Sequence, residues 1–160
     1  MIKKFTHIER NKASMVDISK KTNTNRIAKA SAKVKFSDSS YIKIKENGSS
    51  KGEILSTARI AGIQAGKKTS ELIPLCHSIT INFLSIDFKL DDKNNEIIIN
   101  STCKTNDKTG VEMEALVAVS TAALTIYDMC KAIDKSIQIN DIKLNFKSGG
   151  KSKTYKNDIL

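Results

Sequence analysis

The pattern of apolar and polar residues predicts a mixed fold in which four strands accompany two main helices. Apolar side chains recur at every second position in the strand segments, as expected of strands that bury one face. Asp91–Asn94 link two of these segments in the manner of a hairpin, and Asn140-Asp141 interrupt the alternation of the last one. The strands are predicted at residues 30–36, 79–90, 95–104 and 136–147.

Two other stretches have the spacing of helices. Residues 53–66 repeat small apolar side chains, mostly alanine, at helical intervals, which permits close packing. A short helical turn follows, and Pro74 stops it. The second helix is predicted to begin at a capping box formed by Thr109 and Glu112 and to run to about Ala132.

The segments between the first strand and the first helix are less regular. Residues 38–46 fit a helix, which Ser37 could cap, and they also fit a strand in which Ile42 and Ile44 alternate with lysines. Residues 47–52 are rich in glycine and serine and predict a flexible loop.

The order strand, helix, strand, strand, helix, strand is that of a split βαβ unit. It predicts an α+β, ferredoxin-like fold, with the helices packed on one face of an antiparallel sheet. We expect an extended or flexible arm over residues 1–28, the folded domain over 29–147 and a flexible tail over 148–160. Many unrelated activities share this fold, so it does not by itself indicate a function.

The second helix carries a polar stripe on one side. At 100° per residue the stripe contains Glu114, Thr121, Thr125, Asp128 and Lys131. Val117 and Leu124 lie within it, so it fits an interface as well as a solvated face. The side expected to face the sheet consists of Ala115, Val119, Ala122, Ile126 and Met129.

The two carboxylates of this stripe are far apart. Glu114 and Asp128 are 14 residues apart in sequence, about 21 Å along a helix axis, and cannot reach one ligand within a single chain. If both act on one ligand, a two-fold partner with an antiparallel copy of the helix must supply one of them.

Composition excludes several classes of protein. The length of 160 residues suits one domain. No uninterrupted apolar run of 18 residues occurs, so no membrane span is expected, and a start without an apolar signal core predicts a cytoplasmic location. Three cysteines without a C-x-x-C pair, and two histidines, argue against a disulfide framework and a zinc or multi-histidine centre. We therefore expect no metal and no other cofactor.

The net charge of +10 is concentrated toward the ends of the chain. Residues 1–51 contain 13 basic and 4 acidic side chains, whereas residues 52–144 contain 10 and 12. A basic periphery can bind a polyanion such as RNA, or steer a phosphorylated small molecule. Since 24 of the 27 basic residues are lysine, in a chain also rich in isoleucine and asparagine, AT-rich coding explains most individual lysines better.

Two short motifs indicate little by themselves. The Gly-Lys-Ser at residues 150–152 resembles the end of a P-loop, but Asn145 occupies the first glycine position and no helix can follow, which excludes a Walker A motif. Loose contact of backbone amides with phosphate remains open. Cys76-His77 lacks the third residue of a cysteine protease and is more typical of a structural pair.

Several contiguous blocks nevertheless resemble one known family, and together they span nearly the whole chain. The blocks are Met15–Ser19, Ala58–Ile63, Leu72–His77, Lys108–Leu116, Ala123–Ala132 and Lys147–Ser152, with Lys67 and Thr69 between the second and third. The chain is similar to the cyclic pyranopterin monophosphate synthase family, protein C of molybdenum cofactor biosynthesis. It departs from the family pattern at Ser78, where proline is usual, and at Gly66, where alanine is usual.

The resemblance implies a ferredoxin-like catalytic domain, a hexamer built from dimers, and an active site at the dimer interface. The implied lyase reaction converts (8S)-3',8-cyclo-7,8-dihydroguanosine 5'-triphosphate to cyclic pyranopterin monophosphate and diphosphate, with no nucleic acid or membrane as partner. By the same resemblance Asp128 is catalytic, and Lys51 and Lys131 form the acid/base pair. The residues implied to bind substrate are Leu75, Cys76, His77, Met113, Glu114, Glu112, Lys147 and Arg26.

These residue types suit that chemistry. Rebuilding a purine-derived ring as a pterin moves protons on and off nitrogen and carbon, and a crowded cationic pocket depresses the pKa of lysines enough for the task. The expelled diphosphate needs cations, for which Lys51, Arg26 and Lys147 are candidates. Asp128 could orient Lys131 or accept a proton. Because Lys51 lies in the predicted loop, we expect it to become ordered when substrate binds.

Two other interpretations stay open, namely an RNA-binding ferredoxin-like module and an inactive homologue that acts as an assembly partner. RNA-binding sheets stack bases on exposed aromatic rings. Phe83, Phe88 and Phe146 lie in apolar runs that favour the core instead. The presence of all three implied catalytic residues argues against the inactive homologue.

Overall fold

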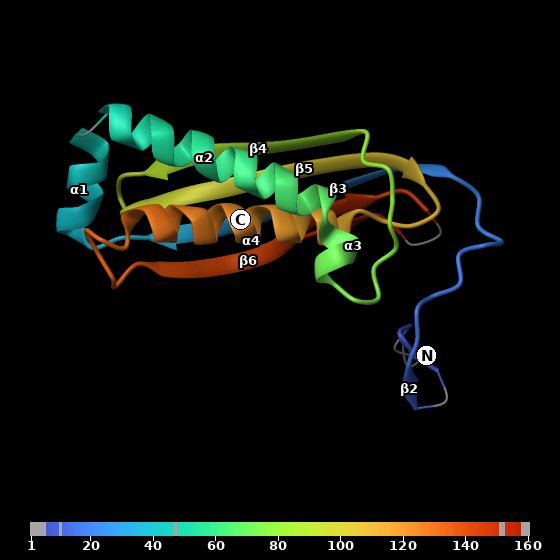
Figure 1. Cartoon of the computed structure of the whole chain (residues 1–160). Coiled ribbons are helices and arrows are strands. Elements are labelled where there is room, and N and C mark those ends of the chain that lie inside the picture. Colours follow the sequence, from blue (N-terminus) through green and yellow to red (C-terminus); the bar gives the residue numbers. More distant parts are fainter. Residues whose placement is uncertain (1–5, 10, 47, 151–152, 158–160) are drawn as a thin grey trace.

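One antiparallel sheet with helices on one side makes up the body of the protein (Figure 1). The structure, a computed structural model, describes residues 6–9, 11–46, 48–150 and 153–157, without the side chains of residues 9 and 48–51. The strands are β1 (Ile8–Glu9), β2 (Lys12–Ala13), β3 (Thr24–Lys35), β4 (Phe83–Asp91), β5 (Glu96–Asp107), β6 (Gln138–Ser148) and β7 (Tyr155–Lys156). The helices are α1 (Asp38–Glu46), α2 (Gly48–Lys67), α3 (Thr69–Leu72) and α4 (Glu112–Cys130).

The strand order β4-β5-β3-β6-β7 confirms the predicted α+β, ferredoxin-like arrangement. β3 lies at the centre and pairs antiparallel with both β5 and β6. The helices α1 and α2 connect β3 to β4, and α4 connects β5 to β6, so each connection crosses over one intervening strand. A small β1–β2 hairpin precedes this body and forms a sheet of its own.

The core lies between the sheet and the pair α2 and α4. Side chains at alternate positions of β3, from Ala28 to Val34, are fully buried beneath the helices. The helices approach each other closely, as predicted from their small residues: a Cβ added at Gly62 would lie 2.6 Å from the carbonyl oxygen of Ala118. This tight layer fixes where α4 begins, and the start of α4 positions the candidate site.

The strands differ from the predicted ones mainly at their ends. β3 begins at Thr24 and pairs with β5 along its whole length, which carries β5 to Asp107. These extra residues are polar, so they do not show the alternation of apolar and polar side chains that predicts a strand. Hydrogen bonds between the backbones of the paired strands hold them in place instead. The predicted irregularity in the last strand is confirmed, because the pairing of β6 with β3 shifts near Asp141, whose φ is +52°. β4 begins only at Phe83, and residues 79–82 are not strand.

The ambiguous segment is a helix. Tyr41 and Ile44 are three residues apart and both buried, whereas Ile42 is exposed, which is the helical pattern and excludes the strand. The loop predicted at 47–52 is wrong for residues 48–52, because α2 starts at Gly48. Helix propagation from the alanine-rich stretch adds one hydrogen bond per residue and outweighs local composition. Asn47 lies outside the described residues.

The start of α4 also differs from the prediction. Its N-cap position is Val111, without a capping side chain, so the Thr109–Glu112 capping box is wrong. The Glu112 carboxylate accepts a hydrogen bond from Lys147 instead, at 2.8 Å. Glu114 is only 4% exposed and therefore does not lie on a solvated stripe, and Met129 is exposed rather than packed on the sheet.

Two smaller expectations fail at the surface. The tail is not wholly without structure, because β7 at Tyr155–Lys156 pairs with β6. Phe83 is 47% exposed on the sheet face opposite the helices, with Lys104 5.1 Å from its ring centroid, so it does not belong to the core. It stands at the start of the edge strand β4, where one face has no helix above it.

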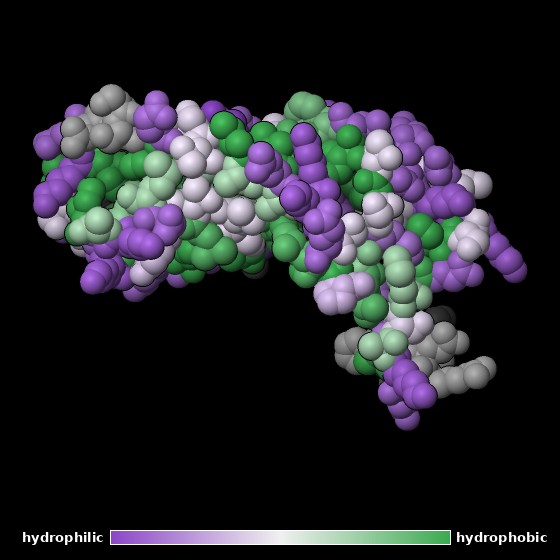
Figure 2. Space-filling view, in the orientation of Figure 1, coloured by the Kyte–Doolittle hydropathy of each residue, from purple (hydrophilic) through white to green (hydrophobic). Residues whose placement is uncertain are grey.

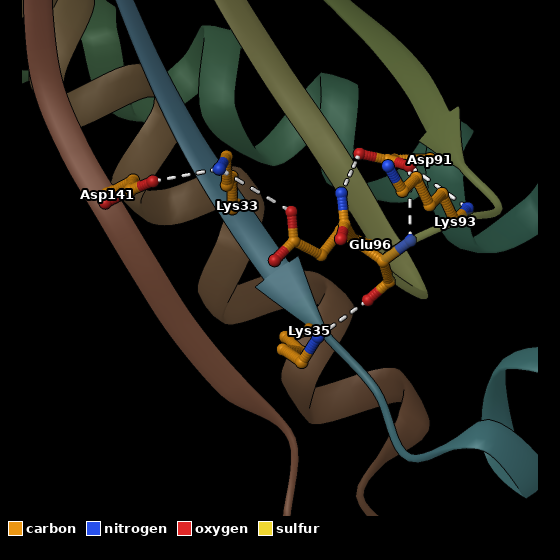
Figure 3. Close-up of polar contacts among 7 residues, drawn as sticks. Lys33, Lys35, Asp91, Lys93, Glu96 and Asp141 are labelled. Carbon is orange, nitrogen blue, oxygen red and sulfur yellow. Dashed lines mark hydrogen bonds and ion pairs between the residues drawn. The ribbon is translucent and has the colours of Figure 1, made fainter.

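A charged network ties three strands together on the open face of the sheet. Lys33 of β3 lies between Asp141 of β6, at 3.0 Å, and Glu96 of β5, at 3.6 Å (Figure 3). Glu96 is buried, and its Oε2 atom has no hydrogen-bond donor within the described residues. The hydrogen bond with Asp141, together with the charge of Glu96, raises the pKa of Lys33 and keeps it cationic.

By length and composition, α4 is the one described helix that could cross a membrane. Half of that stretch is buried inside the fold, where α4 packs against α2 and the sheet. The core helix of a globular domain passes the same test, so the finding is weak evidence for a span.

Candidate active site

Two adjoining cavities lie around the start of α4. The first, of about 430 Å³, is lined by the end of the arm, β3, the loop before α4 and the end of β6. The second, of about 290 Å³, lies between the arm, the loop after α3 and the first turn of α4. Both are lined by Lys21, Thr109, Gly110 and Glu112, so they form one continuous surface.

The first cavity is strongly cationic. Its charged lining consists of Lys21, Arg26, Lys108 and Lys147 against the single carboxylate of Glu112. Lys147 Nζ donates to Glu112 Oε1 at 2.8 Å, and both side chains are partly exposed. Cations that outnumber their carboxylate within one concave surface favour a polyanionic ligand such as an oligophosphate.

Arg26 is held in place by backbone on two sides. Its Nε donates to the Asp107 carbonyl oxygen at 2.8 Å and its Nη2 donates to that of Lys108 at 2.9 Å. On the other side, the turn at Gly149 and Gly150 has positive φ angles of +95° and +75°. A Cβ at Gly149 would lie 2.1 Å from the backbone carbonyl oxygen of Asn25, so this turn beside Arg26 requires glycine.

The second cavity contains a buried carboxyl group. Glu114 lies beside Cys76, His77 and Met113 in its lining. Burial raises the pKa of Glu114 from its ordinary 4.5 to about 7; its own backbone N–H opposes this, and the nearby charge of Glu112 adds to it. A carboxyl group that titrates near neutral pH can both donate and accept a proton under cellular conditions.

A thiol and an imidazole lie next to this carboxyl group. Burial, with a smaller effect from Glu114, raises the pKa of Cys76 and keeps it as a thiol rather than a nucleophilic thiolate. The Nε2 atom of His77 lies 2.8 Å from the carbonyl oxygen of Val16. Leu75, from the same loop, completes this side of the cavity.

The structure therefore brings together eight of the predicted site residues and leaves three elsewhere. Arg26, Glu112 and Lys147 line the first cavity, and Leu75, Cys76, His77, Glu112, Met113 and Glu114 line the second. Asp128 and Lys131 line neither cavity. The backbone of Lys51 lies in the first turn of α2, and its side chain is outside the described residues.

Asp128 and Lys131 form an exposed pair at the other end of α4. Lys131 Nζ donates to Asp128 Oδ1 at 2.7 Å, and their side chains are 57% and 69% exposed. This hydrogen bond, and the charge of Asp128, raise the pKa of Lys131. In the isolated chain Lys131 is thus a stable cation and not a base.

The two long helices expose large apolar side chains. Leu124 is 59% exposed and Ile60 of α2 is 60% exposed. Figure 2 shows apolar and polar side chains mixed over this helix-bearing side. Exposed apolar residues beside a split constellation of charged groups are typical of an interface.

Several lining residues were missed by sequence reasoning. Lys21, Thr22, Thr24, Lys108 and Thr109 line the first cavity. His7 and Val16 of the arm line the second. The signal for Lys108 and Thr109 lay in the block beginning at Lys108, whereas nothing in the arm's weak periodicity distinguished His7 or Lys21. No group of three or more metal-ligating side chains occurs within the described residues, and the donor set here is cationic.

Comparison with known proteins gives a consistent result. The MoaC family model matches residues 15–150. Proteins from Bordetella avium, Clostridium acetobutylicum and Clostridium botulinum, each named cyclic pyranopterin monophosphate synthase, are similar to this chain. The first is 52% identical and covers 90% of this chain and 89% of the relative; the second is 54% identical, with 92% of each covered. The third is 50% identical over 99% of this chain and 100% of the relative.

The family match covers every lining residue of the first cavity, and of the second cavity all except Thr6 and His7 of the arm. Together with relatives that align over nearly their whole length, it leaves no part of the sheet or of α4 outside the comparison. The chain belongs to the MoaC family.

Proposed function

We propose that this chain is a cyclic pyranopterin monophosphate synthase, a lyase of molybdenum cofactor biosynthesis. It converts (8S)-3',8-cyclo-7,8-dihydroguanosine 5'-triphosphate to cyclic pyranopterin monophosphate and releases diphosphate. The observation that carries the proposal is the junction of the two cavities, one cationic and one containing Glu114, a carboxyl group that titrates near neutral pH. That junction suits a ligand with a triphosphate at one end and a ring that exchanges protons at the other.

The triphosphate lies in the first cavity. When the cyclic phosphate closes, a hydroxyl oxygen of the ligand attacks the α-phosphorus and releases its proton to water, the bond from the α-phosphorus to the bridging oxygen of the β-phosphate breaks, and diphosphate leaves. Lys21, Lys108 and Lys147 line this cavity and can neutralise the charge that develops on the leaving group. The backbone contacts of Arg26 hold its guanidinium in a fixed orientation, which lowers the reorganisation needed during the step.

The ring lies in the second cavity. Glu114 is placed to supply or take up one proton during ring opening and reclosure, and it can do so because burial holds its pKa near 7. Cys76, which is a thiol, and Met113 provide a weakly polar wall beside it. The remaining proton transfers belong to lysine side chains.

One of these lysines, Lys131, comes from a second copy of the chain. Asp128 lies about 21 Å from Glu114 along α4, and Lys131 lies further still, so an antiparallel partner helix has to bring them to the cavity. The exposed Leu124, midway along α4, supports this face as the contact. In the complete site, the cations of the first cavity replace water around Lys131 and lower its pKa, which turns it from a stable cation into a proton carrier.

Several parts of the proposed enzyme extend beyond what one chain contains. Lys51 is the second lysine of the acid/base pair, Asp128 orients or deprotonates Lys131, and the dimers assemble into a cytoplasmic hexamer. Residues 29–147 are the catalytic domain, with the arm and tail at the rim of its pocket. No cofactor takes part.

The test is conversion of the cyclised dihydroguanosine triphosphate, followed as diphosphate release. Wild type is compared with Asp128→Ala and Lys51→Ala, and with the matched controls Asp87→Ala and Lys89→Ala on the open face of the sheet. We expect release by wild type and both controls and a loss of at least about 100-fold in the two site variants. Equal release by all five proteins would overturn the site; no release by folded wild type would favour an inactive homologue or an RNA-binding module.

A further inference from the structure

The described residues before β3, 6–9 and 11–23, form an arm that the body holds at few points. The β1–β2 hairpin lies apart from the sheet and helices (Figure 1). Within the described residues, two side-chain hydrogen bonds join this arm to the body. His77 Nε2 lies 2.8 Å from the Val16 carbonyl oxygen in a partly buried contact, and Lys108 Nζ donates to the Ser19 carbonyl oxygen at 3.4 Å in an exposed one.

The shorter contact defines which ring nitrogen of His77 donates to the arm. A backbone carbonyl oxygen can only accept, so the Nε2 atom of His77 carries the hydrogen and donates it to Val16. In the neutral ring Nδ1 is then the lone-pair acceptor. Nδ1 has no hydrogen-bond partner within the described residues, so the contact with Val16 is made by Nε2 alone.

The arm is one wall of the candidate site. Thr6, His7, Val16 and Lys21 line the second cavity from the arm side, opposite the loop that carries His77. Lys21 also lines the cationic first cavity. The position of the arm therefore decides whether this ammonium group faces the junction of the two cavities.

Short turns transmit the position of Val16 to Lys21. Asp17 Oδ1 accepts hydrogen bonds from the Ser19 N–H at 2.8 Å and from the Ser19 hydroxyl at 2.5 Å. The Lys21 N–H donates to the Ile18 carbonyl oxygen at 3.0 Å. These consecutive turns limit the freedom of the chain between the two residues, so fixing Val16 also restricts Lys21.

We propose that His77 is a positioning residue: its Nε2–H latches the arm through the Val16 carbonyl oxygen and thereby holds Lys21 at the junction of the two cavities. The latch depends on the Nε2 position of the ring and not on Nδ1. The part that concerns substrate affinity rests on the proposed function; the latch itself does not.

Two substitutions at the same position test whether the latch needs a donor at the Nε2 position. In His77→Gln the amide nitrogen reaches as far as the imidazole Nε2 and can still donate to Val16, whereas in His77→Asn it reaches only as far as Nδ1. Ser78→Ala, at the exposed neighbouring position, is the matched control. Release of the arm is measured as the rate of tryptic cleavage after Lys20 and Lys21 by mass spectrometry, on full-length protein whose circular dichroism matches wild type.

We expect wild type, His77→Gln and Ser78→Ala to be cleaved at similar rates and His77→Asn to be cleaved at least about fivefold faster. Equal rates for all four proteins, or equally fast cleavage of both His77 variants, would overturn the latch. With the cyclised triphosphate as substrate, KM should rise at least about fivefold more in His77→Asn than in His77→Gln. If no protein turns the substrate over, the proposed function fails while the cleavage rates still decide the latch.

Discussion

The burial of Glu114 predicts a pH dependence of stability that one substitution removes. The carboxyl group is 4% exposed, and its pKa rises from 4.5 to about 7 on folding. Because the folded state binds this proton more tightly, its contribution to stability is fully present below pH 4.5 and is lost as the pH rises through 7. At about 1.4 kcal/mol per pH unit, wild type loses about 2–3 kcal/mol between pH 5 and pH 8 from this group.

Glu114→Gln keeps the shape of the side chain and has no charge to bury. The difference in free energy of unfolding between Glu114→Gln and wild type should therefore shift by about 2–3 kcal/mol in favour of the variant between pH 5 and pH 8. It is measured by urea denaturation, followed by circular dichroism at one protein concentration. Glu53→Gln, at an exposed position of α2, is the matched control and should follow the wild-type curve. A difference between Glu114→Gln and wild type that stays constant with pH would refute the reasoning.

Two further predictions concern packing and charge. Lys33→Met leaves the buried Glu96 carboxylate without its cation and should lower the free energy of unfolding by about 1–3 kcal/mol in urea denaturation; adding Glu96→Gln should restore part of the loss, and strictly additive effects would contradict the pairing. Gly62→Ala should lower the melting temperature, because its Cβ would lie 2.6 Å from the backbone oxygen of Ala118. Gly66→Ala should stay within about 1 kcal/mol of wild type, since its Cβ meets first the end of a flexible leucine side chain; equal melting temperatures for the two glycine variants would contradict the packing account.

The fold was predictable because each strand buries one face and each long helix one side. Residues 30–36 and 53–66 contain that signal, and the structure has a strand and a helix there. The polar start of β3 was missed because cross-strand backbone pairing, not burial, orders it. The first turn of α2 was missed because glycine and serine indicate a loop when the helix that follows is disregarded.

The site was less predictable, and for a different reason. A spacing argument can place residues on one element, as it did for Glu114 and Asp128 on α4, but it does not show which of them the body buries. Glu114 is buried because the loop after α3 and the sheet close over the start of α4, a contact between distant segments. Nothing local in the sequence marks Lys21, which reaches the cavities only because the arm folds back past His77.

The central claim is that each active site combines the cavities of one chain with the Asp128–Lys131 end of another. The test mixes two variants that are each expected to be inactive: Lys147→Ala, which damages the cavity, and Asp128→Ala, which damages the Asp128–Lys131 end. The two proteins are unfolded, mixed and refolded together. Random pairing leaves one complete site in half of the dimers, so diphosphate release should recover to about a quarter of the wild-type rate. Release that stays at the level of the separate variants would show that both residues act within one chain, and the account of a shared site would be wrong.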